Sequence, residues 1–286
     1  MEGARLVAVV DTVPERAAEI AAVSNTRALA DYRELLGEVD AVVVAVPTEV
    51  HAEIAVPFLE SGVPVLVEKP LARQLADADR MLAAARSGKA MIAVGHTERH
   101  NPAVAVALDL VSAPKFIEVH RLSAFPDRSL DIDVVFDLMI HDLDVILAIV
   151  RSDVVSIEAV GVPVLTDKYD IANVRLRFAS GCIANITASR ISRDRVRKIR
   201  FFQPDAYLSV DYASQEVEGW RLVRKLPRPD IQGGAIPVER DEPLRRELAD
   251  FVRAVRDRTP PLVDGDAGRR ALVLAERIAE KMESVG

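Results

Sequence analysis

The first 95 residues alternate short, continuously apolar runs with segments of helical pattern, and this alternation restricts the fold more than any other feature. The runs are rich in β-branched residues, which is typical of strands buried on both faces of a parallel sheet. The helical segments between them supply the crossovers that parallel strands need. We expect strands at residues 6–10, 41–46, 63–67 and 90–94, and helices at residues 14–23, 49–61 and 74–87.

Polar residues follow these strands, at the edge where such sheets bind ligands. Asp11 ends the first strand, where a carboxylate in a dinucleotide fold binds the adenosine ribose; the alternative is a helix cap or turn. A carboxylate there would repel a 2′-phosphate, so Asp11 favours NAD over NADP. His51 lies in the first turn of the predicted helix after Pro47 and Thr48, where it either binds a ligand or is exposed to solvent. The candidate residues at the strand ends are Asp11, Pro47, Thr48, Glu68, Lys69, Gly95 and His96.

Two further polar segments are candidates for ligand contacts. Lys69 follows a buried strand and can orient a ribose or a substrate hydroxyl, with Glu68 holding it, although a plain surface pair has the same sequence. Arg99, in the polar segment after Gly95, can meet a phosphate or form an ion pair between domains.

The pattern changes after His96 and predicts a second domain. Helices are expected at residues 101–111 and 133–150, with strands before and after the second helix. Residues 173–178 alternate polar and apolar side chains, as in an antiparallel sheet with one wet face. We therefore expect an α/β domain over residues 1–98 and an α+β domain with a mainly antiparallel sheet over residues 99–286, closed by helices at residues 242–256 and 264–283.

A polar stripe on the second of these helices is the strongest catalytic signal. The residues Asp133, Asp137, His141 and Asp144 share one face of an otherwise apolar helix. Asp137, one turn before His141, can orient the ring and raise its basicity, as a general base requires. One alternative is an Asp–His pair with a purely structural role. The other is a metal site, but His120 and Asp142 are isolated and the sequence offers no further cluster of metal ligands.

Composition and charge narrow the class of protein. With 37 Lys and Arg against 44 Asp and Glu, the net charge of −7 argues against a nucleic-acid-binding surface. The single cysteine, Cys182, excludes an internal disulfide and a Cys-rich metal site and fits a reducing cytoplasm. No apolar run has the ~18 residues of a membrane span. We expect a soluble, cytoplasmic protein that binds neither nucleic acid nor membrane.

Taken in order, the motifs resemble those of the glucose-fructose oxidoreductase, inositol dehydrogenase and MocA (Gfo/Idh/MocA) family. They are Pro47-Thr48 with His51, Glu68-Lys69-Pro70, Gly95-His96 with Arg99, and Asp137 with His141. The resemblance implies a Rossmann domain, a C-terminal domain whose open sheet joins copies into a homodimer or homotetramer, and NAD(P)-dependent oxidation of a sugar hydroxyl.

The same resemblance assigns roles to individual residues. It implies Lys69, Asp137 and His141 as catalytic residues. It implies cofactor contacts for Asp11, Pro47, Thr48, His51, Glu68, Lys69 and His96, and substrate contacts for Arg99, Asn101, Arg128 and His141. Segments 98–103, 131–135 and 137–142 look like those of the UDP-N-acetylglucosamine 3-dehydrogenases, apart from His100, where these enzymes usually have phenylalanine.

One expected element is missing from the sequence. The 13 glycines include no G-x-G-x-x-G, the turn that binds the pyrophosphate and lies about 20 residues before the acidic ribose-binding residue. The chain therefore looks short by one β–α unit, roughly 30 residues, whose strand belongs between the strands that end at Asp11 and Val46. A start codon placed too far downstream and a true truncation both explain this. From the family resemblance we expect a sugar or nucleotide-sugar dehydrogenase. The alternatives are another reductase or an NAD-dependent glycosidase of the same fold, and a cofactor-free binding or assembly protein.

Overall fold

The computed structural model describes residues 3–125, 132–224 and 228–283, which divide into two compact units. Unit 1 comprises Met1–Gly95 and Glu247–Arg269, and unit 2 comprises His96–Arg246 and Arg270–Gly286. The expected division at residue 98 lies close to the first of these boundaries. It did not include the return of Glu247–Arg269 to unit 1.

The parallel strands of unit 1 form two separate sheets. Strand β1 (Ala8–Val10) pairs only with β2 (Arg27–Leu29) among the described residues, and β3 (Val42–Val44) pairs only with β4 (Val65–Glu68). Strand β5 (Ile92–Gly95) completes the second sheet on the other side of β4. No strand pairing between β1 and β3 occurs among the residues that the structure describes.

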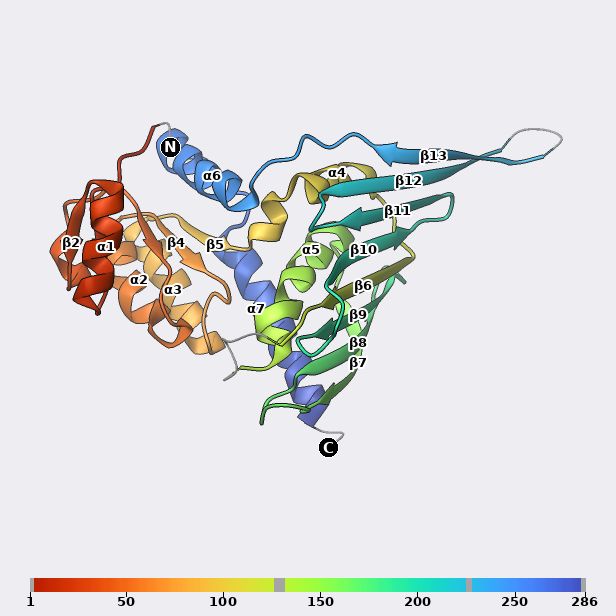
Figure 1. The fold of residues 1–286 in the computed structure, drawn as a ribbon, viewed down its shortest axis with the longest axis horizontal. Coiled ribbons are helices and arrows are strands. Elements are labelled where there is room, and N and C mark those ends of the chain that lie inside the picture. Colours follow the sequence, from red (N-terminus) through yellow and green to blue (C-terminus); the bar gives the residue numbers. More distant parts are fainter. Residues whose placement is uncertain (1–2, 126–131, 225–227, 284–286) are drawn as a thin grey trace. The chain divides into compact units, whose positions relative to one another are not determined.

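Helices connect the parallel strands of unit 1, as the alternating sequence predicts (Figure 1). Pro14 occupies the first turn of the first helix, where a missing N–H has no cost. Asn25 and Lys89 end two of the helices in the left-handed conformation. The elements are α1 (Pro14–Ser24), the 3₁₀ turns η1 (Tyr32–Leu35) and η2 (Thr48–Val50), α2 (His51–Glu60) and α3 (Leu75–Gly88).

The C-terminal part of the chain completes unit 1. Helix α6 (Pro243–Asp257) packs Phe251 against Leu66 and Ala93 of the three-stranded sheet. The N–H of Val94 donates to the carbonyl of Val263 at 3.1 Å. A Cβ on Gly268, in the first turns of α7 (Gly265–Glu283), would lie 2.6 Å from a methyl of Val94, so glycine allows this close approach. These contacts explain why residues 247–269 belong with unit 1.

Unit 2 contains one sheet in the order β13-β12-β11-β10-β6-β9-β8-β7 (Figure 1). Its central strands β6 and β9 are parallel and all other neighbours are antiparallel. The strands are β6 (Phe116–Leu122), β7 (Val154–Val162), β8 (Ile171–Phe178), β9 (Ile183–Ser189), β10 (Val196–Phe202), β11 (Ala206–Asp211), β12 (Glu216–Val223) and β13 (Asp230–Ile236).

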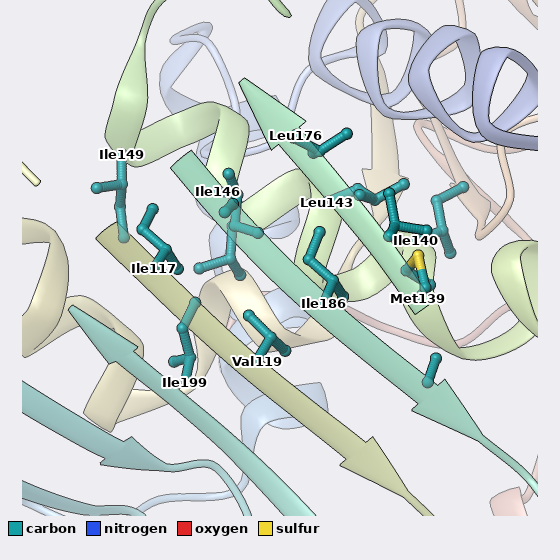
Figure 2. Close-up of a cluster of buried hydrophobic side chains, with 14 of the residues drawn as sticks. Ile117, Val119, Met139, Ile140, Leu143, Ile146, Ile149, Leu176, Ile186 and Ile199 are labelled. Carbon is teal, nitrogen blue, oxygen red and sulfur yellow. The ribbon is translucent and has the colours of Figure 1, made fainter. Parts of the chain in front are cut away.

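Apolar side chains from one face of this sheet pack against helices and form the core of unit 2 (Figure 2). Helix α5 (Ile140–Val150) contributes Ile140, Leu143, Ile146 and Ile149. The helix α4 (Pro102–Leu110) and the later turns of α7 add further side chains. Strand residues of this core that Figure 2 labels are Ile117, Val119, Leu176, Ile186 and Ile199.

Three local features differ from the sequence expectations. The strands β2 and β13 were not predicted, since β2 is only three residues long and β13 contains Gly233 and Gly234. The helix predicted over residues 133–150 is regular only from Ile140, because Val135–Met139 forms a π-helical turn, η4. Among the described residues, no helix is both long and apolar enough to cross a membrane.

Candidate active site

The strand ends of unit 1 bring most of the predicted cofactor-binding residues to one edge of the three-stranded sheet. In the parallel register Val44 lies beside Val67, and Glu68 lies beside Gly95. Pro47 and Thr48 follow β3, while Lys69 follows β4 directly. A Cβ on Gly95 would lie 2.9 Å from Oε2 of Glu68, so the absence of a side chain there makes room for the carboxylate. The same Oε2 accepts the N–H of Lys69 at 3.3 Å.

Asp11 follows β1 and shapes the turn into α1. Its Oδ1 accepts the N–H of Val13 at 2.8 Å, and its Oδ2 lies 3.3 Å from Nη1 of Arg16. The hydrogen bond from Val13 and the nearby Arg16 lower the pKa of the carboxyl group. The turn interaction considered for Asp11 is therefore present, and binding of a ribose stays a prediction.

His51 is not the solvated helix residue that the sequence suggested. Its side chain is buried, with Nδ1 3.2 Å from the carbonyl oxygen of Leu71 and Nε2 3.0 Å from that of Val46. The ring therefore joins the end of the β3 segment to the chain just beyond the cis peptide Lys69-Pro70. Both ring nitrogens face backbone carbonyls, and a neutral imidazole donates to one of them; cofactor contact by His51 stays a prediction.

The polar stripe of unit 2 begins in the π-helical turn. Asp137 lies in η4, and His141 lies in the first turn of α5. Such wide turns in helices occur frequently at functional sites. Two other members of the stripe have structural partners: Oδ1 of Asp133 accepts the N–H of Tyr169 at 2.9 Å, and Asp144 forms an ion pair with Arg99. The pairing of Asp137 with His141 stays a prediction.

A second imidazole lies against His141. His96, the first residue of unit 2, is 1% exposed, and its ring meets that of His141 edge-on, with centroids 6.3 Å apart and planes at 88°. The sequence suggested a cofactor contact for His96. Its contact with the proposed general base could not be predicted from spacing, because 45 residues separate the two in the chain.

The predicted substrate-binding residues have different surroundings. Nη1 of Arg99 lies 3.3 Å from Oδ1 of Asp144, and both residues belong to unit 2, so this ion pair does not join two domains. Asn101 is buried; its Oδ1 accepts the N–H of Ala103 and caps α4, and its amide donates to Glu98 and to the carbonyl of Tyr212. Both amide hydrogens and the amide oxygen have partners within unit 2, and substrate contact by Asn101 stays a prediction. Arg128 lies outside the described residues.

Sequence reasoning missed a buried ionic cluster in unit 2. Arg121 forms ion pairs with Asp142 and with Glu98, and its guanidinium lies 5.1 Å from the ring centroid of Tyr212. Asp142, described as isolated on the basis of sequence, has Oδ2 2.6 Å from Nε of Arg121. The sequence did contain a sign of this cluster, because two carboxylates on the apolar helix α5, Asp142 and Asp144, require buried partners. The partner itself cannot be read from spacing.

The residues at the strand ends fit part of a dinucleotide. The carboxylates of Asp11 and Glu68, the hydroxyl of Thr48 and the ammonium of Lys69 are groups that bind ribose hydroxyls and amides. No G-x-G-x-x-G turn for the pyrophosphate occurs in the sequence. Among the residues described, no group of three or more His, Cys, Asp or Glu side chains is arranged to hold a metal ion.

Comparison with known proteins agrees with this arrangement. Residues 1–96 match the model of the oxidoreductase family with an NAD-binding Rossmann fold, and residues 75–203 match that of the GFO/IDH/MocA C-terminal domain. A UDP-N-acetylglucosamine 3-dehydrogenase of Acidithiobacillus ferrooxidans is 37% identical over 283 residues, which cover 98% of this chain and 90% of the relative. A myo-inositol 2-dehydrogenase of Thermotoga maritima is 27% identical over 90% of this chain and 82% of its own.

Solved structures give the same result. The structure of the Acidithiobacillus ferrooxidans enzyme matches with a TM-score of 0.91 at 36% identity, over 98% of this chain and 90% of that one. A levoglucosan dehydrogenase in complex with NADH and levoglucosan matches with a TM-score of 0.88 at 19% identity, over 98% of this chain and 88% of that one, which shows a shared fold. The chain belongs to the Gfo/Idh/MocA family of NAD(P)-dependent oxidoreductases.

Proposed function

We propose that this chain oxidises the 3-hydroxyl of UDP-N-acetylglucosamine to a ketone, with NAD⁺ as the oxidant. The likeness to the Acidithiobacillus ferrooxidans enzyme, which extends over 98% of the chain, carries this proposal. The acidic Asp11 supports NAD over NADP, because a carboxylate at this position would repel the 2′-phosphate of NADP.

The proposed chemistry uses one proton acceptor and one cation. His141 takes the proton from the sugar hydroxyl, and Asp137 orients the ring for that transfer. Lys69 stabilises the negative charge that develops on the same oxygen. NAD⁺, when bound, would supply the acceptor for the hydride of the carbinol carbon. Asp11, Thr48 and Glu68 hold the cofactor, supported by the buried His51, and Arg99 contacts the substrate.

The test measures NADH absorbance while purified protein is incubated with NAD⁺ and UDP-N-acetylglucosamine. His141→Ala is expected to lower kcat by about 10²–10⁴-fold, the usual contribution of a positioned acid–base group. Lys69→Ala should also lower kcat. Lys89→Ala is the matched control, since Lys89 is an exposed lysine of the same unit at the end of α3. Unchanged turnover in His141→Ala would remove His141 from the mechanism.

A cofactor-free binding protein is the second candidate, and the broken parallel sheet favours it. Within the described part of the chain β1 pairs only with β2 and β3 only with β4, and the sequence contains no G-x-G-x-x-G turn for a pyrophosphate. The two candidates differ in a thermal-shift experiment. A dehydrogenase is stabilised by NAD⁺, whereas a cofactor-free protein keeps the same Tm at every NAD⁺ concentration. The same measurement on a form begun at an upstream in-frame codon shows whether added residues bring NAD⁺ binding.

We further propose that copies associate through the uncovered face of the eight-stranded sheet. Phe116, Phe202, Tyr207 and Trp220 form a row across four strands of that face, with successive ring centroids 5.0–5.6 Å apart. Such rows of partly buried aromatic rings favour association of protein surfaces. Tyr207→Glu should shift the protein towards monomer in sedimentation velocity, and an unchanged oligomeric state would exclude this face.

A further inference from the structure

A buried guanidinium contacts the helix that carries His141. Arg121 lies on β6, whose side chains alternate between the core and the opposite face of the sheet. It occupies a core position in line with Ile117 and Val119, and only 3% of its side chain is exposed. A buried charge is unfavourable unless close partners replace its water. The partners of Arg121 therefore indicate what the residue does.

Arg121 joins three elements of unit 2. It binds Asp142 of α5 in bidentate fashion, with Nε 2.6 Å from Oδ2 and Nη2 3.1 Å from Oδ1. Its Nη1 lies 3.1 Å from Oε1 of Glu98, in the 3₁₀ turn η3 (Thr97–His100). Its guanidinium also lies 5.1 Å from the ring centroid of Tyr212, which follows β11. Planar, bidentate contacts of this kind fix orientation as well as distance.

The charges in this cluster hold the arginine in its protonated form. Burial lowers the pKa of Arg121, but the carboxylates of Asp142 and Glu98 more than offset this, and the pKa lies above its ordinary value. Burial and the charge of Asp142 raise the pKa of Tyr212 well above its usual range, which keeps the phenol neutral. Burial raises the pKa of Asp142 above its ordinary value although the charge of Arg121 opposes this, and Arg121 itself stays protonated near neutral pH.

Both ionic partners of Arg121 are close in the chain to the two imidazoles in edge-on contact. Asp142 follows His141 directly, and Glu98 lies two residues after His96. The bidentate contact limits rotation of α5 about its own axis, while the contact with Glu98 limits movement of η3. Arg121 thus links the two elements that bring His96 and His141 together, and the ion pair of Arg99 with Asp144 joins the same two elements.

We propose that Arg121 is a positioning residue for His141: through Asp142 and Glu98 it fixes the ring of the base against His96. This inference rests on one part of the proposed function, the role of His141 as the general base. Arg121 itself touches neither cofactor nor substrate in this proposal, and it acts through the orientation of α5 and η3.

The first test requires no catalytic activity. The chain has five histidines, so their imidazole ¹H–¹⁵N correlations can be resolved and assigned by substitution. Asp142→Asn keeps the size of the side chain but replaces one acceptor by a donor that faces Arg121, which removes the bidentate contact. The signals of His141 and His96 should both shift, and that of His51, in unit 1, should not. Unshifted signals of His141 and His96 would overturn the proposal.

The second test separates positioning from a general loss of structure. Arg121→Met and Asp142→Asn should lower kcat by up to about 10²-fold, the cost of a misplacement of about 1 Å, and leave KM for NAD⁺ unchanged. Arg240→Met is the control, because Arg240 forms an exposed ion pair with Glu216 in the same unit. Trp220 fluorescence, the signal of the single tryptophan, shows whether each variant is folded. If Arg121→Met does not fold, Asp142→Asn carries the test.

The decisive measurement combines each substitution with His141→Ala. If Arg121 acts through His141, neither substitution lowers kcat further once the imidazole is absent. Additive losses would contradict the inference and leave the proposed function intact. A normal kcat in His141→Ala alone would instead contradict the proposed function, and the imidazole shifts would still decide whether Arg121 positions the ring.

Discussion

The two-stranded sheet of unit 1 and the eight-stranded sheet of unit 2 differ in how far their strands are paired and their apolar side chains are buried. Strand β1 pairs with a single strand, β2, in the described parts of the chain, and the helix α1 beside it buries only Ala17 and Ala21 while Val23 is 84% exposed. In the larger sheet the inward side chains of β6, β8 and β9 are almost fully buried. Because unpaired edges and exposed apolar side chains lower local stability, the segment with Asp11 should be far less stable than the framework that carries His141.

The largest expected effect is in amide hydrogen exchange. Amides of β1 and α1 should exchange through local opening, whereas those of Ile117 and Ile186 should exchange only when unit 2 unfolds. The protection factors should therefore differ by about 10³-fold or more. Mass-spectrometric exchange with peptides covering residues 8–24 and 116–122 measures the difference. Equal protection in both peptides would show that the open edges have no energetic consequence.

Much of unit 1 could be predicted because its strands are locally encoded. The apolar runs at residues 41–46 and 63–67 correspond to β3 and β4, and the polar residues after them lie at one sheet edge. The short β2 carries no such signal, since Arg27–Leu29 is defined by its pairing with β1 rather than by its own residues. The return of residues 247–269 depends on contacts of Phe251 with residues far away in the chain.

The candidate site could be predicted by residue type but not by contact. The stripe pointed to Asp137 and His141, yet the π-helical turn depends on backbone hydrogen bonds that side-chain periodicity does not reveal. Burial of His51 depends on the carbonyls of Val46 and Leu71, which tertiary structure brings to the ring. Arg121 and Asp142 are 21 residues apart in the chain, and neither helical nor strand periodicity predicts a contact at that separation.

A second difference between the units concerns ion pairs. In unit 2, Nε of Arg190 lies 2.8 Å from Oδ1 of Asp170, and both side chains are fully buried. Burial alone raises the pKa of Asp170, but backbone N–H groups of residues 164–166 and the arginine lower it, so the net pKa lies well below its ordinary value. In unit 1, Arg269 and Asp79 form an exposed pair.

Removing the buried pair should have the second largest effect. Arg190→Met leaves a buried carboxylate without its cation and should destabilise unit 2 by about 3–5 kcal/mol. Trp220 lies in unit 2, so urea denaturation followed by its fluorescence reports on that unit. Arg269→Met is the control, and it should leave the midpoint of this transition unchanged. A shift of the midpoint by both substitutions would mean that the two units unfold as one.

The smallest expected effect is the difference in stability lost when valine is replaced by alanine at two positions, one buried and one at an open sheet edge. Val174, in β8, is fully buried, so Val174→Ala should cost about 2 kcal/mol through two lost methyl groups and the cavity they leave. Val43, in β3 at the open edge, is 48% exposed, so Val43→Ala should cost less than about 1 kcal/mol. Trp220 fluorescence in urea measures the first, and exchange of the β4 amides measures the second. A cost at Val43 equal to that at Val174 would mean that the open edge of β3 is covered in solution, since only burial makes a methyl group that costly to remove.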